Sequence, residues 1–132
     1  MKYLLDASAL LAYLLAEPEA DKVERMIFMD GGGEPVCAVS FAAWVGIFAC
    51  LKRVGAPMAE IHEQLEDARH LPIATLWPDE ETLKTMLEIR AKGFFPFADC
   101  LAVATAVRWN LILAHKDEHF DKLDFRFKRL RL

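Results

Sequence analysis

The chain has 132 residues, of which 55% are apolar and 27% charged, and its formal net charge is −4. This length suits one domain that buries a core, and the apolar content excludes general disorder. The mild acidity excludes a strongly basic nucleic-acid binder, although a local site can differ in charge from the whole. We therefore expect a single domain over residues 1–132.

Cysteine usage and apolar segments favour a cytoplasmic protein. Cys37, Cys50 and Cys100 are odd in number and lack zinc-ligand spacing, so we expect reduced, buried thiols. No signal-peptide pattern is evident, since Asp6 interrupts the first apolar run. The longest apolar run, residues 41–51, falls short of the roughly 20 residues of a membrane span. We expect no membrane association.

Short apolar runs alternate with longer amphipathic segments along the chain. The runs predict strands at residues 3–5, 35–39, 72–76 and 111–114. The amphipathic segments predict helices at residues 9–15, 18–30, 41–53, 58–70, 78–93 and 100–109. Alternating apolar and basic residues at 125–132 predict an edge strand. This order predicts an α/β fold, a three-layer α/β/α sandwich with a mostly parallel central sheet.

Two serines stand where helices are expected to begin. Ser40 precedes the predicted helix at 41–53, and we expect it to cap that helix. Ser8 either caps the first helix, orients Asp6 or contacts a phosphate, and we favour the cap.

Three aspartates are expected at one edge of the sheet. Asp6 ends the first strand, Asp117 follows the strand at 111–114, and Asp99 opens the helix leading into that strand. Open parallel sheets carry their sites beyond the carboxyl ends of the strands. Clustered carboxylates need protons or cations, and oxygen-only ligands favour Mg²⁺ or Mn²⁺ over zinc. Alternatively, each aspartate has a structural role in a turn, cap or loop, and spacing alone does not decide.

Four segments resemble, in order, the motifs of PIN domains. Residues 4–10 are similar to their first motif, a strand ending in Asp-x-Ser, and residues 39–44 to the start of the second-motif helix. Residues 98–106 resemble their central helix motif, and residues 113–120 their late strand motif. The resemblance extends to VapC-type toxins and implies a PIN-like fold.

This resemblance also implies a function and partners. It implies a magnesium-dependent ribonuclease, the toxin of a type II toxin–antitoxin pair, neutralised by a small antitoxin protein. Asp6, Asp99 and Asp117 are then the catalytic and metal-binding residues, with Mg²⁺ or Mn²⁺ as cofactor and RNA as substrate. Homodimers are common in this family, so a homodimer is expected.

The sequence departs from the family pattern at one position. The second-motif helix of the family carries an acidic residue, and the register of Ser40-Phe41 and Trp44 places Gly46 there. Losing that charge is expected to weaken divalent-cation binding, although one ion held by three aspartates can still polarise a phosphate and activate water. The alternative is a weakened or inactive PIN module that binds RNA or a protein partner. A third interpretation is a dimerisation domain without a ligand.

Other residues have two open interpretations. His115 and His119 flank Asp117 and are either accessory ligands or proton shuttles, or ordinary loop residues. The basic residues of the C-terminal end either grip a phosphate backbone or protect an edge strand; they are Lys116, Lys122, Arg126, Lys128, Arg129 and Arg131. Phe94, Phe95 and Phe97 either stack on bases or belong to the core or a partner surface.

The helix predicted at residues 41–51 is apolar nearly all round. A helix of this kind is buried on more than one side. We expect part of it to face a second copy of the chain or an antitoxin segment.

Overall fold

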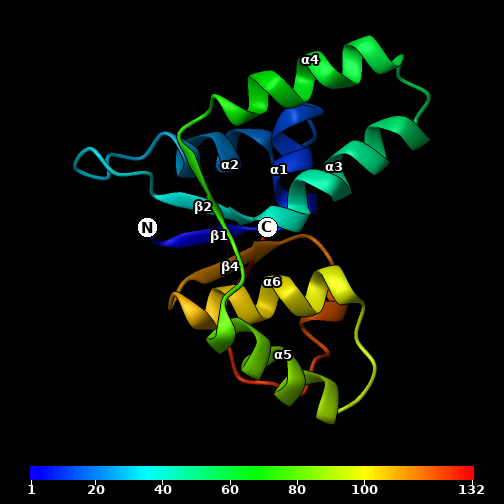
Figure 1. Cartoon of the computed structure of the whole chain (residues 1–132). Helices are drawn as coiled ribbons and strands as arrows, with labels where there is room; N and C mark the ends of the chain where they lie inside the picture. The colour runs from blue at the N-terminus through cyan, green and yellow to red at the C-terminus, as the bar shows by residue number, and fades with distance from the viewer.

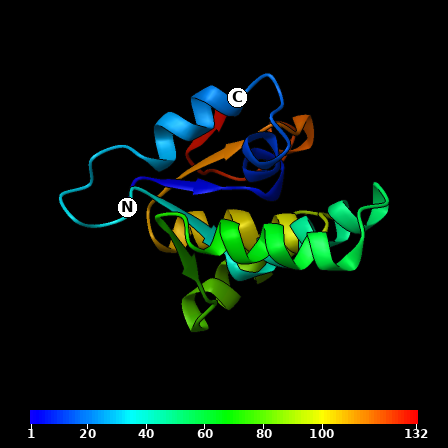
Figure 2. The same cartoon turned by 90° about the horizontal axis from the view of Figure 1, so that it is seen from above.

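A five-stranded sheet, parallel throughout, forms the centre of the computed structural model, which describes residues 1–132 (Figure 1). The strands are β1 (Tyr3–Leu5), β2 (Cys37–Ser40), β3 (Ile73–Leu76), β4 (Ile112–His115) and β5 (Arg129–Arg131). Their order is β3-β2-β1-β4-β5, so the first strand of the chain is central. All five predicted strands are confirmed, including the one in the basic tail, which lies at the edge beside β4 (Figure 2).

Helices cover both faces of the sheet, as predicted. They are α1 (Ala7–Leu14), α2 (Ala20–Ile27), α3 (Phe41–Arg53), α4 (Met58–Arg69), α5 (Glu80–Ala91) and α6 (Phe97–Arg108), with a short 3-10 helix at Glu118–Phe120. Figure 1 shows α1 to α4 on one side of the sheet and α5 and α6 on the other. None of these helices combines the length and the apolar character needed to cross a bilayer.

Side-chain alternation along the strands builds the two core layers. Leu5 packs into the layer with α1 to α4, whereas its neighbour Leu4 packs into the layer with α5 and α6. The same alternation separates Ala114 from Leu113 in β4. Successive strand residues point to opposite faces, so a continuous apolar run can serve both layers.

The thiols are reduced, as expected. Cys37 and Cys100 are buried in the core, while Cys50 is half-buried on α3. Burial raises the pKa of the Cys37 thiol to about 11, so this cysteine is an unreactive part of the core.

Helix α3 leaves part of its apolar surface exposed in the single chain. Ala43, Ile47 and Leu51 are buried, but Val45 on another face is 65% exposed. The helix packs against α1, α4, α6 and β2. Its apolar outer side is therefore open in the single chain.

Four helix starts differ from the expected ones. Helices α2 and α5 begin two residues later than predicted, at Ala20 and Glu80, and the other two, α1 and α6, lie near the three aspartates. Helix α1 begins at Ala7, and its N-cap is Asp6 instead of Ser8. Asp6 is still extended, because its N–H donates to the Ala114 carbonyl of β4 at 3.0 Å, and its own carbonyl accepts the first helical bonds. Helix α6 begins at Phe97, directly after Pro96, so Asp99 lies in the first turn instead of opening the helix. The Ser40 cap of α3 is confirmed, with Oγ accepting from Ala42 N at 3.3 Å.

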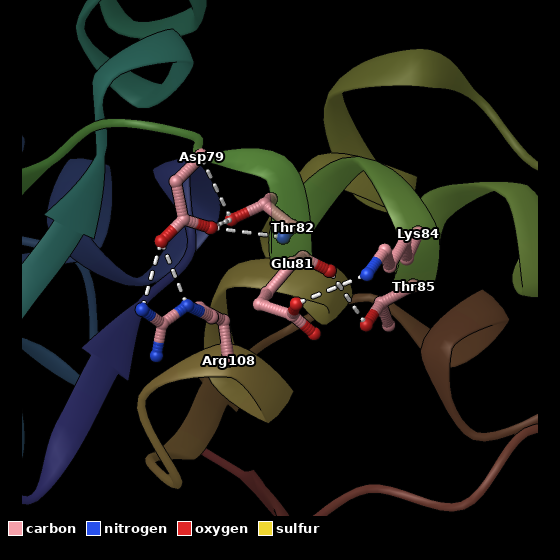
Figure 3. A network of polar contacts seen from close by, with 6 residues as sticks. All are labelled: Asp79, Glu81, Thr82, Lys84, Thr85 and Arg108. Atoms are coloured by element: carbon pink, nitrogen blue, oxygen red, sulfur yellow. Dashed lines mark hydrogen bonds and ion pairs between the residues drawn. The ribbon is translucent and has the colours of Figure 1, made fainter.

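A cap with a second partner fixes α5 against α6 (Figure 3). Asp79 accepts hydrogen bonds from the Thr82 N–H at 3.0 Å and its hydroxyl at 2.9 Å, while Thr82 Oγ1 accepts from the Asp79 N–H. The Arg108 guanidinium, at the end of α6, donates to the other carboxylate oxygen through two nitrogens, each at 2.8 Å. These hydrogen bonds, led by that from the Thr82 backbone, lower the pKa of Asp79.

Candidate functional site

A pocket of about 290 Å³ opens at the carboxyl ends of β1, β2 and β4. Asp6 reaches it from the end of β1, Asp99 from the first turn of α6, and Asp117 from the segment after β4. The structure thus brings the three sequence-predicted aspartates to the wall of one pocket. This is the place where an open parallel sheet carries its ligands.

Asp6 is held by Ser8 and sits in an unfavourable electrostatic environment. The Ser8 hydroxyl donates to Asp6 Oδ2 at 2.8 Å, and the Ser8 N–H donates to the same oxygen at 3.3 Å. Burial raises the pKa of Asp6, the Ser8 hydrogen bond opposes this, and the negative charge of Asp99 raises it further. Ser8 therefore orients Asp6, and its expected role as the helix cap is wrong.

Ser8 also connects the segment that follows β1 to the segment that follows β4. Its Oγ accepts a hydrogen bond from the Lys116 N–H at 3.2 Å, across 108 positions of the chain. The Lys116 ammonium forms ion pairs with Glu17 at 2.8 Å and Glu19 at 3.0 Å. The segment that carries Asp117 is therefore anchored to the α1–α2 connection.

Asp99 is paired with His119. The distance from His119 Nε2 to Asp99 Oδ2 is 2.8 Å, and the imidazole is 43% exposed. Burial raises the pKa of Asp99, His119 opposes this, and the charge of Asp117 adds to it. Of the two histidines considered from the sequence, His119 is the one that contacts a pocket aspartate.

His115 lies elsewhere. It ends β4 with its side chain fully buried, packed on the Phe120 ring at 5.0 Å between centroids. Its Nε2 is 3.5 Å from Asp121 Oδ1, and neither ring nitrogen makes a hydrogen bond. Desolvation lowers the pKa of His115, which favours a neutral ring. The structure does not place His115 on the pocket wall, where an accessory ligand would stand.

Gly46 lines the same pocket from α3. A Cβ at this position would meet only the Ala7 Cβ, at 3.4 Å, which is an ordinary contact. A side chain could therefore project from here into the pocket. This position in the pocket supports the alignment in which Gly46 replaces the acidic residue of the second PIN motif.

Two further pocket residues were missed from the sequence. Cys50 and Arg53 lie on α3 and line the pocket with Gly46. Gly46, Cys50 and Arg53 are separated by four and three residues, so they lie on one face of α3. Once Gly46 had been assigned to the site, this spacing could have predicted the other two residues. Arg53 brings the one basic side chain of the pocket wall.

The donor chemistry of the pocket suits a hard divalent cation. It offers three carboxylates, and burial, together with a neighbouring carboxylate, raises the pKa of Asp6 and Asp99. No three carboxylate, imidazole or thiol groups stand close enough to enclose an ion. Magnesium commonly keeps several waters and takes only one or two carboxylates, so the residues fit an ion of that kind.

The basic C-terminal residues divide into several environments. Lys116 and Arg131 are bound in ion pairs, and Lys128 donates to the Asn110 side chain. Arg129 donates to the Phe120 carbonyl. These contacts match the edge-strand interpretation for most of the group. Lys122 instead lines a separate cavity.

Comparisons with known proteins agree with this geometry. The family model described as "PIN domain" matches residues 3–126. No curated protein matches this chain by sequence.

Solved structures of low sequence identity share the fold. VapBC2 from Rickettsia felis, bound to a promoter DNA fragment, gives a TM-score of 0.78 at 12% identity, covering 99% of this chain and 98% of that one. VapBC-1 from nontypeable Haemophilus influenzae gives 0.76 at 13% identity, with the same coverage. VapC20 from Mycobacterium tuberculosis, described as a Sarcin-Ricin loop cleaving toxin, gives 0.69 at 13% identity and covers 98% of this chain and 100% of that one.

Proposed function

Because the chain belongs to the PIN domain family, we propose that it is a metal-dependent endoribonuclease and the toxin of a type II toxin–antitoxin pair. The observation that carries the proposal is the shared pocket of Asp6, Asp99 and Asp117. Members of this family are typically metal-dependent nucleases. A structural neighbour described as a Sarcin-Ricin loop cleaving toxin supports RNA as the substrate.

Each pocket residue has a separate task in this proposal. Asp6, Asp99 and Asp117 hold Mg²⁺ or Mn²⁺, directly or through water. When bound there, such an ion would supply Lewis-acid chemistry, which would polarise a phosphate and activate a water nucleophile. Ser8 fixes the carboxylate of Asp6 through its 2.8 Å hydrogen bond, and His119 fixes that of Asp99. Arg53, at the pocket wall, neutralises part of the phosphate charge.

The proposed partners are an antitoxin protein and a second copy of the chain, in the cytoplasm. Several structural neighbours are toxin–antitoxin complexes, which supports the antitoxin. The open apolar side of α3, where Val45 is 65% exposed, supplies a surface for either partner. Covering such a surface removes apolar area from water, which stabilises a complex.

Incubation of the purified protein with single-stranded RNA and Mg²⁺ tests the activity. We expect cleavage that EDTA abolishes and that the Asp6→Asn variant lacks. Asparagine is about as good an N-cap as aspartate, so this variant keeps the start of α1 while losing a ligand charge. Equal cleavage by the two proteins would remove the catalytic proposal.

The second candidate function is an inactive PIN module that binds RNA or a protein. Gly46 in place of an acid and the absence of three closely grouped ligands favour it. Calorimetric titration with Mg²⁺ distinguishes the two functions. Saturable binding that Asp6→Asn weakens supports the nuclease, and no binding at millimolar Mg²⁺ supports the inactive module.

A further inference from the structure

A second cavity, of about 440 Å³, lies beside the carboxylate pocket. Its wall includes Lys92, Phe94 and Phe95 from the α5–α6 connection, and Lys122 from the segment after the 3-10 helix. His119 lines this cavity and is bonded at 2.8 Å to Asp99, which lines the carboxylate pocket. The two hollows are therefore neighbours joined by one side-chain pair.

Phe94 is the exposed aromatic residue of this cavity. Its side chain is 83% exposed, whereas that of Phe95 is only 6% exposed and belongs to the core. The guanidinium carbon of Arg90 lies 5.2 Å from the centre of the Phe94 ring. Arg90 also donates to the Phe95 carbonyl at 3.3 Å, which ties the connection to α5. An aromatic ring held in place and open to solvent is a stacking surface for a flat ligand.

The cavity also has positive charge available for a ligand. Lys92 and Lys122 form no ion pair within the chain, in contrast to Lys84 and Lys116. One carboxylate on the wall, Asp124, offsets only part of their charge. In a chain of net charge −4, two unpaired ammonium groups beside an exposed ring indicate an anionic, aromatic ligand.

We propose that this cavity binds one nucleotide of a single-stranded RNA whose neighbouring phosphodiester lies over the carboxylate pocket. Phe94 stacks on the base, and Lys92 and Lys122 bind flanking phosphates. His119, which lines the cavity and is bonded to Asp99, places the cavity next to the aspartates. The choice of RNA rests on the proposed function, whereas the aromatic and anionic character of the ligand rests on the cavity itself. The exposed phenylalanine thus selects for unpaired bases, which a duplex does not offer.

Fluorescence anisotropy of a short labelled single-stranded RNA, with the full chain in EDTA, measures binding without cleavage. We expect Phe94→Ala to raise Kd roughly 5- to 100-fold, the range for one lost base–aromatic stack. Phe94→Trp is expected to keep or improve the affinity, and Phe94→Leu to lose it, because only an aromatic ring stacks. Phe97→Ala is the matched control, since Phe97 is 71% exposed but outside the cavity wall.

Salt dependence tests the lysines separately. For single strands each phosphate contact adds about 0.7 to the slope of log K against log salt. The double variant Lys92→Ala/Lys122→Ala should reduce the slope by roughly 1.4, whereas Phe94→Ala and the surface control Lys22→Ala should leave it unchanged.

The outcomes separate this inference from the proposed function. If Phe94→Ala weakens RNA binding, the nucleotide cavity is supported, whether or not the wild-type protein cleaves RNA with Mg²⁺. A lack of cleavage would remove only the nuclease proposal. Unchanged binding in the Phe94 and lysine variants overturns the cavity proposal, even where cleavage is found. If the Phe94 and lysine variants lose binding to a protein partner but still bind RNA, the cavity proposal is also overturned.

Discussion

Two aspartates of this chain cap helices in opposite electrostatic surroundings. Asp79, at the start of α5, accepts hydrogen bonds from Thr82 and Arg108, and these lower its pKa. Asp6, at the start of α1, accepts only from Ser8, and burial together with the charge of Asp99 raises its pKa. Residue type and capping role are the same, so the difference lies in the neighbouring groups.

The comparison separates a carboxylate that serves the fold from one that costs it stability. The protein supplies its own cation to Asp79 in the form of Arg108 (Figure 3). At the pocket of Asp6, two more carboxylates share the wall with a single basic residue, Arg53, and Asp6 forms no ion pair. A charge left uncompensated in this way is typical of a functional site. The four predictions below test the contrast, from the largest expected effect to the smallest.

Substitution to asparagine should affect cleavage at only one of the two aspartates. We expect Asp6→Asn to lower the rate of Mg²⁺-dependent RNA cleavage by at least about 100-fold, because even residues behind metal ligands typically contribute 10- to 100-fold. Asp79→Asn, the matched control, should stay within roughly twofold, since it lies outside the pocket. Initial rates at saturating Mg²⁺ measure both. Equal losses would mean that the pocket has no special role.

Substitution of Asp79 should lower the thermal stability of the protein. Asp79→Ala removes the N-cap of α5 and the partner of Arg108, so we expect Tm to fall by roughly 3–6 °C. Arg108→Gln should lower Tm less, because a partly exposed ion pair contributes little. Thermal unfolding followed by circular dichroism measures the shifts. A larger effect of Arg108→Gln would contradict the assignment of stability to the cap.

An added acid in the pocket should strengthen ion binding. We expect Gly46→Glu to raise Mg²⁺ affinity by about tenfold, because ligand charge tunes the affinity of oxygen sites. Gly46→Gln is the neutral control of the same shape. Gly46→Gln should raise the free energy of unfolding by about 0.5–1 kcal/mol, since glycine is a poor residue for a helix interior. Gly46→Glu should gain less in EDTA, because its charge adds to the repulsion among the pocket carboxylates. Calorimetric titration measures the affinities, and equal values for the two variants would argue against the register that places Gly46 opposite the aspartates.

The pH dependence of stability should have opposite signs at the two aspartates. The folded pKa of Asp6 is raised, so the native state binds its proton more tightly, and the contribution to stability is lost as pH rises above the ordinary value of 3.8 through the folded pKa. For Asp79 the folded pKa is lowered, so its contribution is present above 3.8 and is lost as pH falls through the folded pKa.

Urea unfolding in EDTA at a series of pH values measures this effect. Asp6→Asn should gain stability relative to the wild-type protein as pH rises from 3 to 7, and Asp79→Asn should lose it. The same sign for both variants would show that the two carboxylates do not differ in environment.

The sequence was sufficient for the strands and for the convergence of the aspartates. Short continuous apolar runs are typical of strands in a parallel sheet, and parallel strands place their carboxyl ends at one edge. The first helix start was wrong because Asp6 and Ser8 have similar capping preferences. The hydrogen bond from Asp6 N to Ala114 decides between them, and that partner lies in a distant strand.

Other features depended on contacts between distant residues. The pairing of Asp99 with His119 and of Asp79 with Arg108 joins segments 20 and 29 positions apart. No periodicity encodes such pairs, because they arise only when the helices pack. For α3 the sequence predicted an apolar surface in need of a cover, but such a surface does not say whether the chain itself or a partner provides it.

The central place of β1 has a consequence for synthesis on the ribosome. Tyr3–Leu5 emerges first, but its neighbour β4 emerges only after residue 112 has been made. Until then Asp6 has no Asp117 beside it, and Ser8 has no Lys116 to hold. A nascent chain therefore cannot complete the carboxylate pocket before the segment that carries Asp117 has been made.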